Sequence, residues 1–272
     1  MPDDLVPDDL WERVAPLLPP RPARRHRYPG RLPADDRAAL RGIVYVLSKG
    51  VSWRDVPAQR TGCSGVTAWR RLRDWTEAGV WPHLHEVLLA ELRATGLLEM
   101  DDAAIDGSHI RALKRGAHTG PSPVDRGRPG SKHHLTTDRH GTPLAVTLTS
   151  GNRHDVTQLL PLLDAIPAIP RIRGLRGRPR TRPRRLFADR GYDFDKYRRL
   201  VWKRGIKPLF ARRGVAHGSG LGKTRWVVER TFAWLHQFKR LRIRYEIRAD
   251  LHLGLLQLAC IIICLRRLRT SF

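Results

Sequence analysis

The sequence is short of cysteine, lysine and acidic residues. Its 272 residues include three cysteines, too few for a disulfide framework, which excludes a disulfide-stapled secreted domain and favours an intracellular protein. The first residues, Met1 to Asp4, lack the basic and apolar run of a secretory signal. There are 26 Asp and Glu against 51 Lys and Arg, so the formal charge is +25. A positive surplus of this size favours a polyanionic partner.

Arginine supplies almost all of the positive charge, with 43 Arg against 8 Lys. Its guanidinium group suits bidentate contacts to phosphate, although an arginine-rich codon bias would produce the same composition. Hydrophobic residues make up 41% of the chain and include eight Trp, so a core can form and a wholly disordered basic tail is excluded. The densest run, residues 171–185, has eight Arg, no acid, and several Gly and Pro. It predicts an exposed loop that contacts phosphate, with a solvated loop of no function as the alternative.

The charge divides the chain in two. Residues 1–96 carry 15 basic and 12 acidic residues, a net of +3, whereas residues 97–272 carry 36 and 14, a net of +22. A length of 272 residues allows one large domain or two smaller ones. We therefore predict two domains that meet near residue 96.

Short helices are expected in the first part. Apolar residues recur at helical spacing in four segments, 11–18, 35–50, 64–79 and 81–95. The third of these helices follows a glycine-containing turn and exposes three arginines: Arg70, Arg71 and Arg73. This arrangement is similar to a helix-turn-helix and predicts a DNA-binding module over residues 1–96, with these arginines on the DNA. A small helical bundle whose arginines only face water is the alternative.

Strand and helix patterns alternate in residues 97–272, which predicts an α/β domain. Five strands are expected, at residues 103–110, 131–137, 143–149, 185–188 and 206–211. Helices are expected at residues 155–165, 192–204, 223–241 and 251–268. The most apolar part of the last helix has 15 residues and contains His252 and Gln257, whereas a membrane span needs about 20 apolar residues. We therefore predict a buried core helix and no membrane association.

Three carboxylates stand on apolar elements of this basic domain. Asp106 follows an apolar run on the first expected strand, Asp189 ends the fourth, and Glu229 lies in the long helix. A single such carboxylate usually pairs with an arginine. Together, two strand aspartates and a helix glutamate make a set of oxygen ligands for Mg²⁺, a hard cation. Two such ions can activate a water or a 3′-hydroxyl and stabilise the leaving oxygen of a phosphodiester, which suits a basic protein.

The helix around Glu229 is expected to have a basic face. At about 100° per residue, Arg225, His236 and Arg240 lie within about 40° of Glu229 and form a polar stripe beside an apolar one. We predict that these three residues contact DNA phosphate close to a metal. The alternative is an ordinary ion pair between Arg225 and Glu229 along the helix.

Other candidates for a metal or catalytic site are weaker. Cys260 and Cys264 stand four residues apart on a helix without clustered histidines, which disfavours zinc. His133 and His134 are neighbours on a strand, so their rings are expected on opposite faces of the sheet. Asp155 is expected to cap a helix.

The segments around the three carboxylates resemble those of a known family. They are Asp106–His109, Ala188–Asp193 and Arg225–Leu235. They look like the three acidic blocks of DDE transposases, most closely those of bacterial insertion sequences of the insertion-sequence-five family. Further similar segments are Gly130–His134, Gly151–Asp155 and, in the N-terminal part, Gly50–Pro57. The resemblance covers nearly the whole chain, and its most specific element is the block around Glu229.

The resemblance implies an RNase H-like catalytic core, a mixed five-stranded sheet with helices, preceded by a small all-α domain. It implies that Asp106, Asp189 and Glu229 hold Mg²⁺, with Mn²⁺ as a substitute, and catalyse DNA cleavage and strand transfer. The implied partner is double-stranded DNA, at the ends of the element and at its target, bound by a homodimer at the nucleoid in the cytoplasm. The 39 residues between Asp189 and Glu229 leave no room for a large inserted β-domain.

The sequence departs from relatives that carry a tyrosine before the arginine and a lysine after the glutamate. Gly222 stands three residues before Arg225, and His236 seven after Glu229, so the cation that contacts the terminal base or phosphate stays open. Two other functions remain as alternatives. One is a nuclease on the same core without strand transfer, and the other is a sequence-specific DNA-binding regulator in which the acids are structural.

Overall fold

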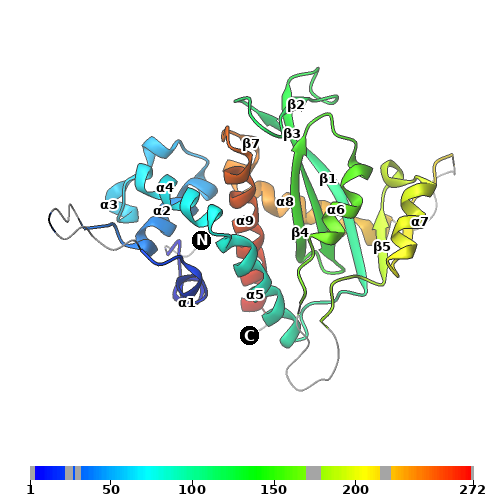
Figure 1. The fold of residues 1–272 in the computed structure, drawn as a ribbon, viewed down its shortest axis with the longest axis horizontal. Coiled ribbons are helices and arrows are strands. Elements are labelled where there is room, and N and C mark those ends of the chain that lie inside the picture. The colour runs from blue at the N-terminus through cyan, green and yellow to red at the C-terminus, as the bar shows by residue number, and fades with distance from the viewer. Residues whose placement is uncertain (1–3, 22–26, 28–31, 170–178, 215–221, 271–272) are drawn as a thin grey trace.

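The computed structural model describes residues 4–21, 27, 32–169, 179–214 and 222–270. Much of the predicted basic loop, residues 171–178, lies outside these described residues. The N-terminal helices stand on one side of the molecule and the sheet on the other, with the last helix between them (Figure 1).

Helices make up the first part of the chain, as predicted. They are α1 (Asp8–Val14), α2 (Asp36–Lys49), α3 (Ala58–Thr61), α4 (Gly65–Glu77) and α5 (Val80–Ala94), with the 3₁₀ turns η1 (Ala15–Leu17) and η2 (Trp53–Asp55). The side chain of Asp35 accepts a hydrogen bond from the Ala38 N–H and begins α2, and Gly50, at φ 72°, ends it. Ser64 begins α4 in the same way by accepting from the Thr67 N–H.

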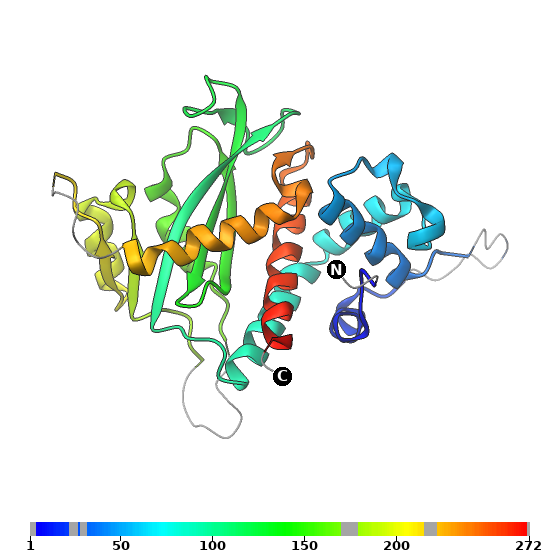
Figure 2. The same ribbon diagram turned by 180° about the vertical axis from the view of Figure 1, so that it is seen from behind.

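One apolar core joins these helices to the rest of the molecule. Leu40 of α2 and Trp75 of α4 belong to the same buried cluster as Ile105 and Leu255, which lie in the second part of the chain. α5 lies side by side with α9 (Ala249–Arg269) in both views (Figures 1 and 2). Because the cluster continues across residue 96, the domain boundary near that residue stays a prediction.

Among the described residues, the second part holds a mixed sheet of seven strands. They are β1 (Asp102–Ala112), β2 (Gly120–Pro121), β3 (Pro129–Asp138), β4 (Pro143–Ser150), β5 (Arg185–Ala188), β6 (Lys207–Phe210) and β7 (Ile243–Arg244). The five predicted strands lie in the order β4, β3, β1, β5, β6, while β2 and β7 are short additions to β3 and β1. β3 is antiparallel to β4 and β1, and β5 is parallel to β1 and β6. The five main strands thus form a mixed sheet, as the resemblance implies.

Helices cover both faces of the sheet. α8 (Gly222–Gln237) crosses one face next to β1 and β3 (Figure 2), while α6 (Leu159–Asp164), preceded by η3 (Asp155–Gln158), lies over β3 and β4 on the other. The remaining elements are η4 (Arg190–Tyr192), α7 (Asp195–Lys203) and η5 (Lys239–Leu241). Because β3 is flanked by strands and covered by helices, it is buried at every residue after its first.

α9 is the buried core helix that the sequence predicts. Its length and composition would allow it to cross a membrane, yet 72% of its most apolar window is buried inside the protein. Cys260 and Cys264 are fully buried in it, and burial raises the pKa of both thiols. Both cysteines are therefore packing residues of the core, as their apolar surroundings indicate.

Two helices differ from their predicted bounds. α8 ends at Gln237 rather than near residue 241, because Phe238 takes an extended conformation (φ −76°, ψ 97°) and buries its ring in the core. The helix predicted from Tyr192 begins at Asp195, because the chain first makes the short turn η4. The first difference changes the surroundings of Arg240, as described below.

Candidate active site

β1 and β5 bring two of the predicted carboxylates to one level of the sheet. In the parallel pairing of these strands, Ala104 lies opposite Phe187. The same register, continued along both strands, puts Asp106 level with Asp189, which directly follows β5. The Asp189 Oδ1 accepts a hydrogen bond from the Gly191 N–H at 2.8 Å, which turns the chain away from the sheet at this residue.

α8 brings the third carboxylate to the same place. The Arg225 guanidinium donates from Nη2 to Glu229 Oε1 at 2.8 Å and from Nη1 to Asp106 Oδ2 at 3.3 Å. The ion pair between Arg225 and Glu229, which the sequence leaves as an alternative, therefore forms, and it extends to β1. The side chains of Asp106 and Arg225 are 21% and 26% exposed, whereas Glu229 is 55% exposed.

Burial and neighbouring charge both act on Asp106. Burial raises the pKa of this carboxyl to about 6; the Gly107 N–H and Arg225 oppose the shift, and the charges of Asp189 and Glu229 add to it. Asp189 and Glu229 are thus close enough to Asp106 for their charges to repel its carboxylate. A cation placed among them would relieve that repulsion.

The donor set suits a hard divalent cation, but the carboxylates are not gathered around one point. Within the described ranges, no three His, Cys, Asp or Glu side chains lie close enough together to hold a metal ion. Glu229 is instead paired with Arg225, whose guanidinium bridges Glu229 and Asp106. Carboxylate oxygens are the ligands that Mg²⁺ prefers. The residues therefore fit such an ion by their chemistry, while Glu229 is held by Arg225 in this structure.

A second polar cluster, which the sequence did not predict, lies behind Gly107. Lys132 Nζ donates to Asp155 Oδ1 at 3.0 Å, and His134 Nδ1 lies 3.8 Å from the same oxygen. His134 is opposite Gly107 in the pairing of β1 and β3, and a Cβ at residue 107 would come within 2.9 Å of Asp155 Oδ1. The glycine that follows Asp106 thus leaves room for this ion pair. The prediction that Asp155 caps a helix is wrong, because its carboxylate accepts from Lys132 instead.

The alternation of side chains along β3 could have revealed this cluster. Lys132 and His134 share one face of the strand, whereas His133 points to the other and its Nε2 lies 2.8 Å from His252 Nε2 of α9. The expectation that His133 and His134 face opposite sides of the sheet is therefore confirmed. What the sequence lacked was the position of Asp155, which is distant in the chain.

Tyr192 is buried close to Asp106 and Asp189 of the candidate site and to Asp155 of the second polar cluster. Its ring is 1% exposed, and its hydroxyl has no hydrogen-bond partner among the residues that the structure describes. Burial raises the pKa of Tyr192 well above its ordinary value, and the charges of Asp106, Asp155 and Asp189 act in the same direction. The hydroxyl is therefore protonated at neutral pH and lies in the field of all three acids.

The three arginines predicted to bind DNA have different surroundings on α4. Arg70 is exposed to solvent. Arg71 Nε lies 3.0 Å from Asp36 Oδ1 of α2, and Arg73 Nη2 donates to Asp74 Oδ1 at 2.7 Å. Two of the three guanidinium groups are therefore held by acids of the same module, and Arg70 is the one turned to solvent.

The predicted basic stripe of α8 stops short of Arg240. Arg240 lies in η5 and is 5% exposed, and its Nε and Nη2 donate to Glu246 Oε1 at 2.9 and 2.6 Å. Its predicted position on a DNA-facing stripe is wrong, because the chain leaves the helix first and the guanidinium is paired in the interior. His236 remains on α8 but packs against Phe232, and burial lowers the pKa of its imidazole, so the ring is neutral at pH 7.

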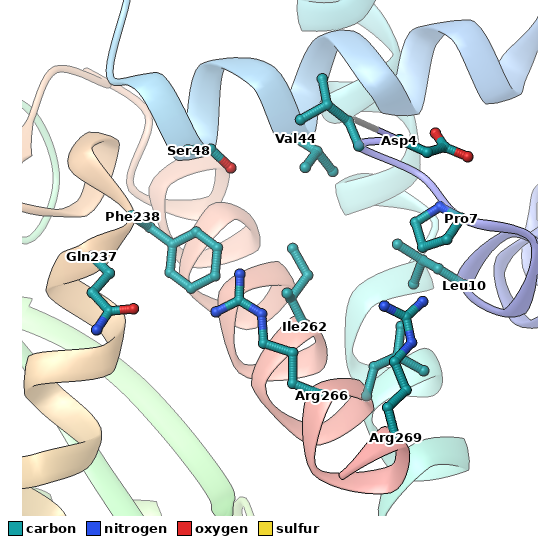
Figure 3. Close-up of a pocket in the computed structure, with 12 residues that line it drawn as sticks. Asp4, Pro7, Leu10, Val44, Ser48, Gln237, Phe238, Ile262, Arg266 and Arg269 are labelled. Atoms are coloured by element: carbon teal, nitrogen blue, oxygen red, sulfur yellow. The ribbon is translucent and has the colours of Figure 1, made fainter. Parts of the chain in front are cut away.

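A pocket of about 380 Å³ lies away from the carboxylates, where α1 and α2 face α9 (Figure 3). Leu10, Val44 and Ile262 contribute apolar wall, and Arg266 and Arg269 line it from α9. None of the three predicted carboxylates lines this pocket. It is therefore a gap between the N-terminal helices and α9, separate from the candidate active site.

Comparisons with known proteins cover both parts of the chain. Residues 98–264 match the transposase DDE domain, and residues 6–85 match a candidate transposase domain of the IS4/5 family. A candidate transposase for insertion sequence element IS402 of Burkholderia cepacia is 63% identical over 153 residues, which are 56% of this chain and 71% of the relative. An uncharacterized 16.2 kDa protein of the same element is 53% identical over 119 residues, 44% of this chain and 81% of the relative. Among solved structures, the Mos1 strand transfer complex matches with a TM-score of 0.32 and 11% identity, over 89% of this chain and 81% of that one.

Proposed function

The chain belongs to the transposases that carry a DDE domain, and from this premise we propose that it moves an insertion sequence. It binds the terminal repeats of the element, cuts the DNA there with Mg²⁺ as cofactor, and joins the released ends to target DNA. Mn²⁺ serves in place of Mg²⁺. Two copies act together on the two ends, at the nucleoid in the cytoplasm.

The register of β1 and β5 is the observation that carries this proposal. It supports a reaction centre at the level of Asp106 and Asp189, with Glu229 added from α8. Residues 97–272 carry a net charge of +22, which by itself would suit phosphate binding alone. Because acids are scarce in this part of the chain, the placement of these three carboxylates supports a catalytic site.

Each carboxylate has a distinct part in the proposed site. Asp106 is fixed by β1 and Asp189 by its bond to the Gly191 N–H, so both are in position to hold a divalent ion once Arg225 has left Asp106. Glu229 is the exposed member and would turn in from α8. When bound, divalent ions would polarise the scissile phosphodiester and make a water or hydroxyl more acidic. The chain itself supplies the positions of these ligands and the basic surface that holds the DNA backbone.

The N-terminal helices are the proposed end-binding module. The exposed guanidinium of Arg70 on α4 supports this assignment, because phosphate contacts need cations that no acid already neutralises. Arg225 is the proposed cation of α8 for DNA phosphate beside the carboxylates, once it has left its ion pairs with Asp106 and Glu229. Arg71, Arg73 and His236 contribute less, because they are paired or neutral in the protein.

Asp189→Asn tests the proposal. Without divalent metal, the variant should bind DNA that carries the terminal repeats as well as the wild type does. With Mg²⁺ it should lose cleavage and strand transfer by more than about a hundredfold. The assay mixes donor DNA that carries the terminal repeats with a target plasmid and Mg²⁺ at pH 8, where Asp106 is ionised. The products are nicked ends and joined molecules, separated on a gel.

Asp195→Asn is the matched control. It removes the same charge from the same region, but Asp195 is 75% exposed and pairs only loosely with Arg212, at 3.3 Å. Activity of Asp195→Asn should stay within a factor of about 2 of the wild type. Full strand transfer by Asp189→Asn would refute the assignment. Cleavage by the wild type without any joined product would favour the nuclease instead.

A further inference from the structure

Arg225 occupies a position between two of the proposed metal ligands. One guanidinium nitrogen lies 3.3 Å from Asp106 Oδ2 and another 2.8 Å from Glu229 Oε1. The acids come from a strand and a helix that are far apart in the sequence, so a single cation links the two elements. An ordinary ion pair along a helix would engage Glu229 alone.

We propose that Arg225 is a resident counter-ion that competes with divalent metal for Asp106 and Glu229, and that DNA phosphate draws it away. This inference rests on the proposed function, since it takes the two carboxylates as metal ligands. Arg225 then acts as a positioning residue. It keeps the carboxylates occupied in the free protein and releases them when the DNA backbone arrives.

The competition is for particular oxygens, because Arg225 engages Asp106 Oδ2 and Glu229 Oε1 while Asp106 Oδ1 already accepts from the Gly107 N–H. Glu229 cannot direct Oε1 at the guanidinium and also turn that oxygen to a metal shared with Asp106 and Asp189. The described side chains are in the first of these arrangements, in which no three acids converge. A divalent ion that bound there would also lie next to the positive charge of Arg225, which lowers the affinity for the ion.

The proposal requires that the Arg225 side chain can move from the two carboxylates to a DNA phosphate. Its side chain is 26% exposed, and that of Glu229 is 55% exposed, so neither is locked in the core. A phosphate diester is a bidentate partner for a guanidinium, comparable to a carboxylate. Movement of Arg225 from the carboxylates to the backbone therefore replaces one ion pair by another, and frees two ligands at the place where the DNA is bound.

Linkage makes the proposal quantitative. If DNA removes a competitor of the metal, then DNA strengthens metal binding, and the metal strengthens DNA binding by the same factor. Couplings of this kind are typically about 5- to 150-fold. A protein without the competitor should show tight metal binding from the start and little coupling.

Mn²⁺ alone is the probe, and its binding to the DNA-free full chain is followed by electron paramagnetic resonance. Arg225→Gln should bind Mn²⁺ at least about tenfold more tightly than the wild type. Arg225→Lys, which keeps a positive charge, should remain close to the wild type. Asp106→Asn should lose the site in either background. Circular dichroism establishes that each variant is folded.

Arg230→Gln is the matched control. Arg230 lies on the same helix, but its guanidinium rests on the rings of Trp226 and Trp234, at 4.4 and 4.8 Å, and donates to the His140 carbonyl. Its loss removes the same charge from α8 without freeing a carboxylate, so Mn²⁺ affinity should change by less than about threefold. Equal gains from Arg225→Gln and Arg230→Gln would overturn the competition.

A second experiment measures the coupling between metal binding and DNA binding directly. The affinity for a mixed-sequence DNA duplex is measured with and without Mn²⁺ at constant ionic strength. The wild type should gain affinity and Arg225→Gln should gain much less. If Arg225→Gln shows no tighter Mn²⁺ binding while Asp106→Asn abolishes it, the inference fails and the proposed function stands. If no variant binds Mn²⁺ through Asp106, the proposed metal site fails with it.

Discussion

Glu246 holds together a buried polar network that joins distant parts of the fold. Its Oε1 accepts from Arg240 at 2.6 and 2.9 Å, and its Oε2 lies 3.3 Å from His252 Nδ1 of α9. Arg240 also donates to the Val51 carbonyl of the N-terminal helical part at 2.9 Å. We expect Glu246→Gln to lower the free energy of unfolding by about 3 kcal/mol, because it leaves a buried guanidinium without its counter-charge.

The histidines of the network are neutral, so they cannot replace the lost charge. Burial lowers the pKa of both His133 and His252. A neutral His252 donates from Nδ1 to Glu246 and accepts at Nε2 from the Nε2–H of His133, 2.8 Å away. His133 Nδ1 is then the unprotonated nitrogen, which agrees with its having no partner among the described residues. The carboxylate of Glu246 is thus the charge that balances Arg240.

The effect should depend on pH with a defined sign. Burial raises the pKa of Glu246, but the hydrogen bond to His252 and the charge of Arg240 outweigh it and lower the value to about 2, from an ordinary 4.5. A carboxyl with a depressed pKa stabilises the fold fully above its unfolded value, and that stabilisation is lost as the pH falls toward the folded value. The advantage of the wild type over Glu246→Gln should therefore be full at pH 7 and roughly 1 kcal/mol smaller at pH 3.5.

Urea unfolding followed by tryptophan fluorescence measures both effects. Trp53 is a local probe, because the guanidinium of Arg240 lies 5.9 Å from the centre of its ring. Asp164→Asn is the control, since it removes a carboxylate from an exposed pair with Arg204 and should cost less than about 1 kcal/mol. A loss below about 1 kcal/mol for Glu246→Gln, or a wild-type advantage that grows on acidification, would refute this account of the network.

Two further predictions concern the N-terminal helices. Gly65→Ala should lower the free energy of unfolding by about 2 kcal/mol or more, because a Cβ there would lie 1.6 Å from the Trp53 carbonyl oxygen. Gly222 begins α8, and a Cβ there would meet open space, so Gly222→Ala should change that free energy by less than about 0.5 kcal/mol in the same urea assay. Arg70→Ala should weaken DNA binding at unchanged thermal stability and reduce the slope of log affinity against log salt by about 1 in fluorescence anisotropy, and an unchanged slope would argue against a phosphate contact.

Local patterns in the sequence predicted most of the fold. Asp35 and Ser64 begin α2 and α4, and Gly50 ends α2, because caps and glycines act on their own turn of chain. The five main strands were found for the same reason. The positions of Asp106 and Asp189 could also be predicted locally, because Asp106 lies within the apolar strand β1 and Asp189 directly follows the apolar strand β5.

Contacts between distant residues were out of reach of the sequence. Helical periodicity continues past Gln237, so only the packing of Phe238 in the core reveals that α8 stops there. That ending carries Arg240 from the predicted stripe to Glu246 in the interior. In the same way, nothing in the spacing of Lys132 and Asp155 predicts that they meet behind Gly107. Their contact depends on how β3 and η3 pack against each other in the folded protein.

The formal charge of +25 overstates what the protein can offer to DNA. Arg244 is fully buried, and its guanidinium donates to main-chain carbonyls and hydroxyls, among them those of Ala117, Ile247 and Ser131. Arg244 of β7 therefore has a structural role and, being buried, cannot contact a DNA phosphate. With Arg240 also internal, part of the basic surplus is structural. The salt dependence of DNA binding should therefore report on exposed cations such as Arg70, and on Arg225 only once its carboxylates have been released.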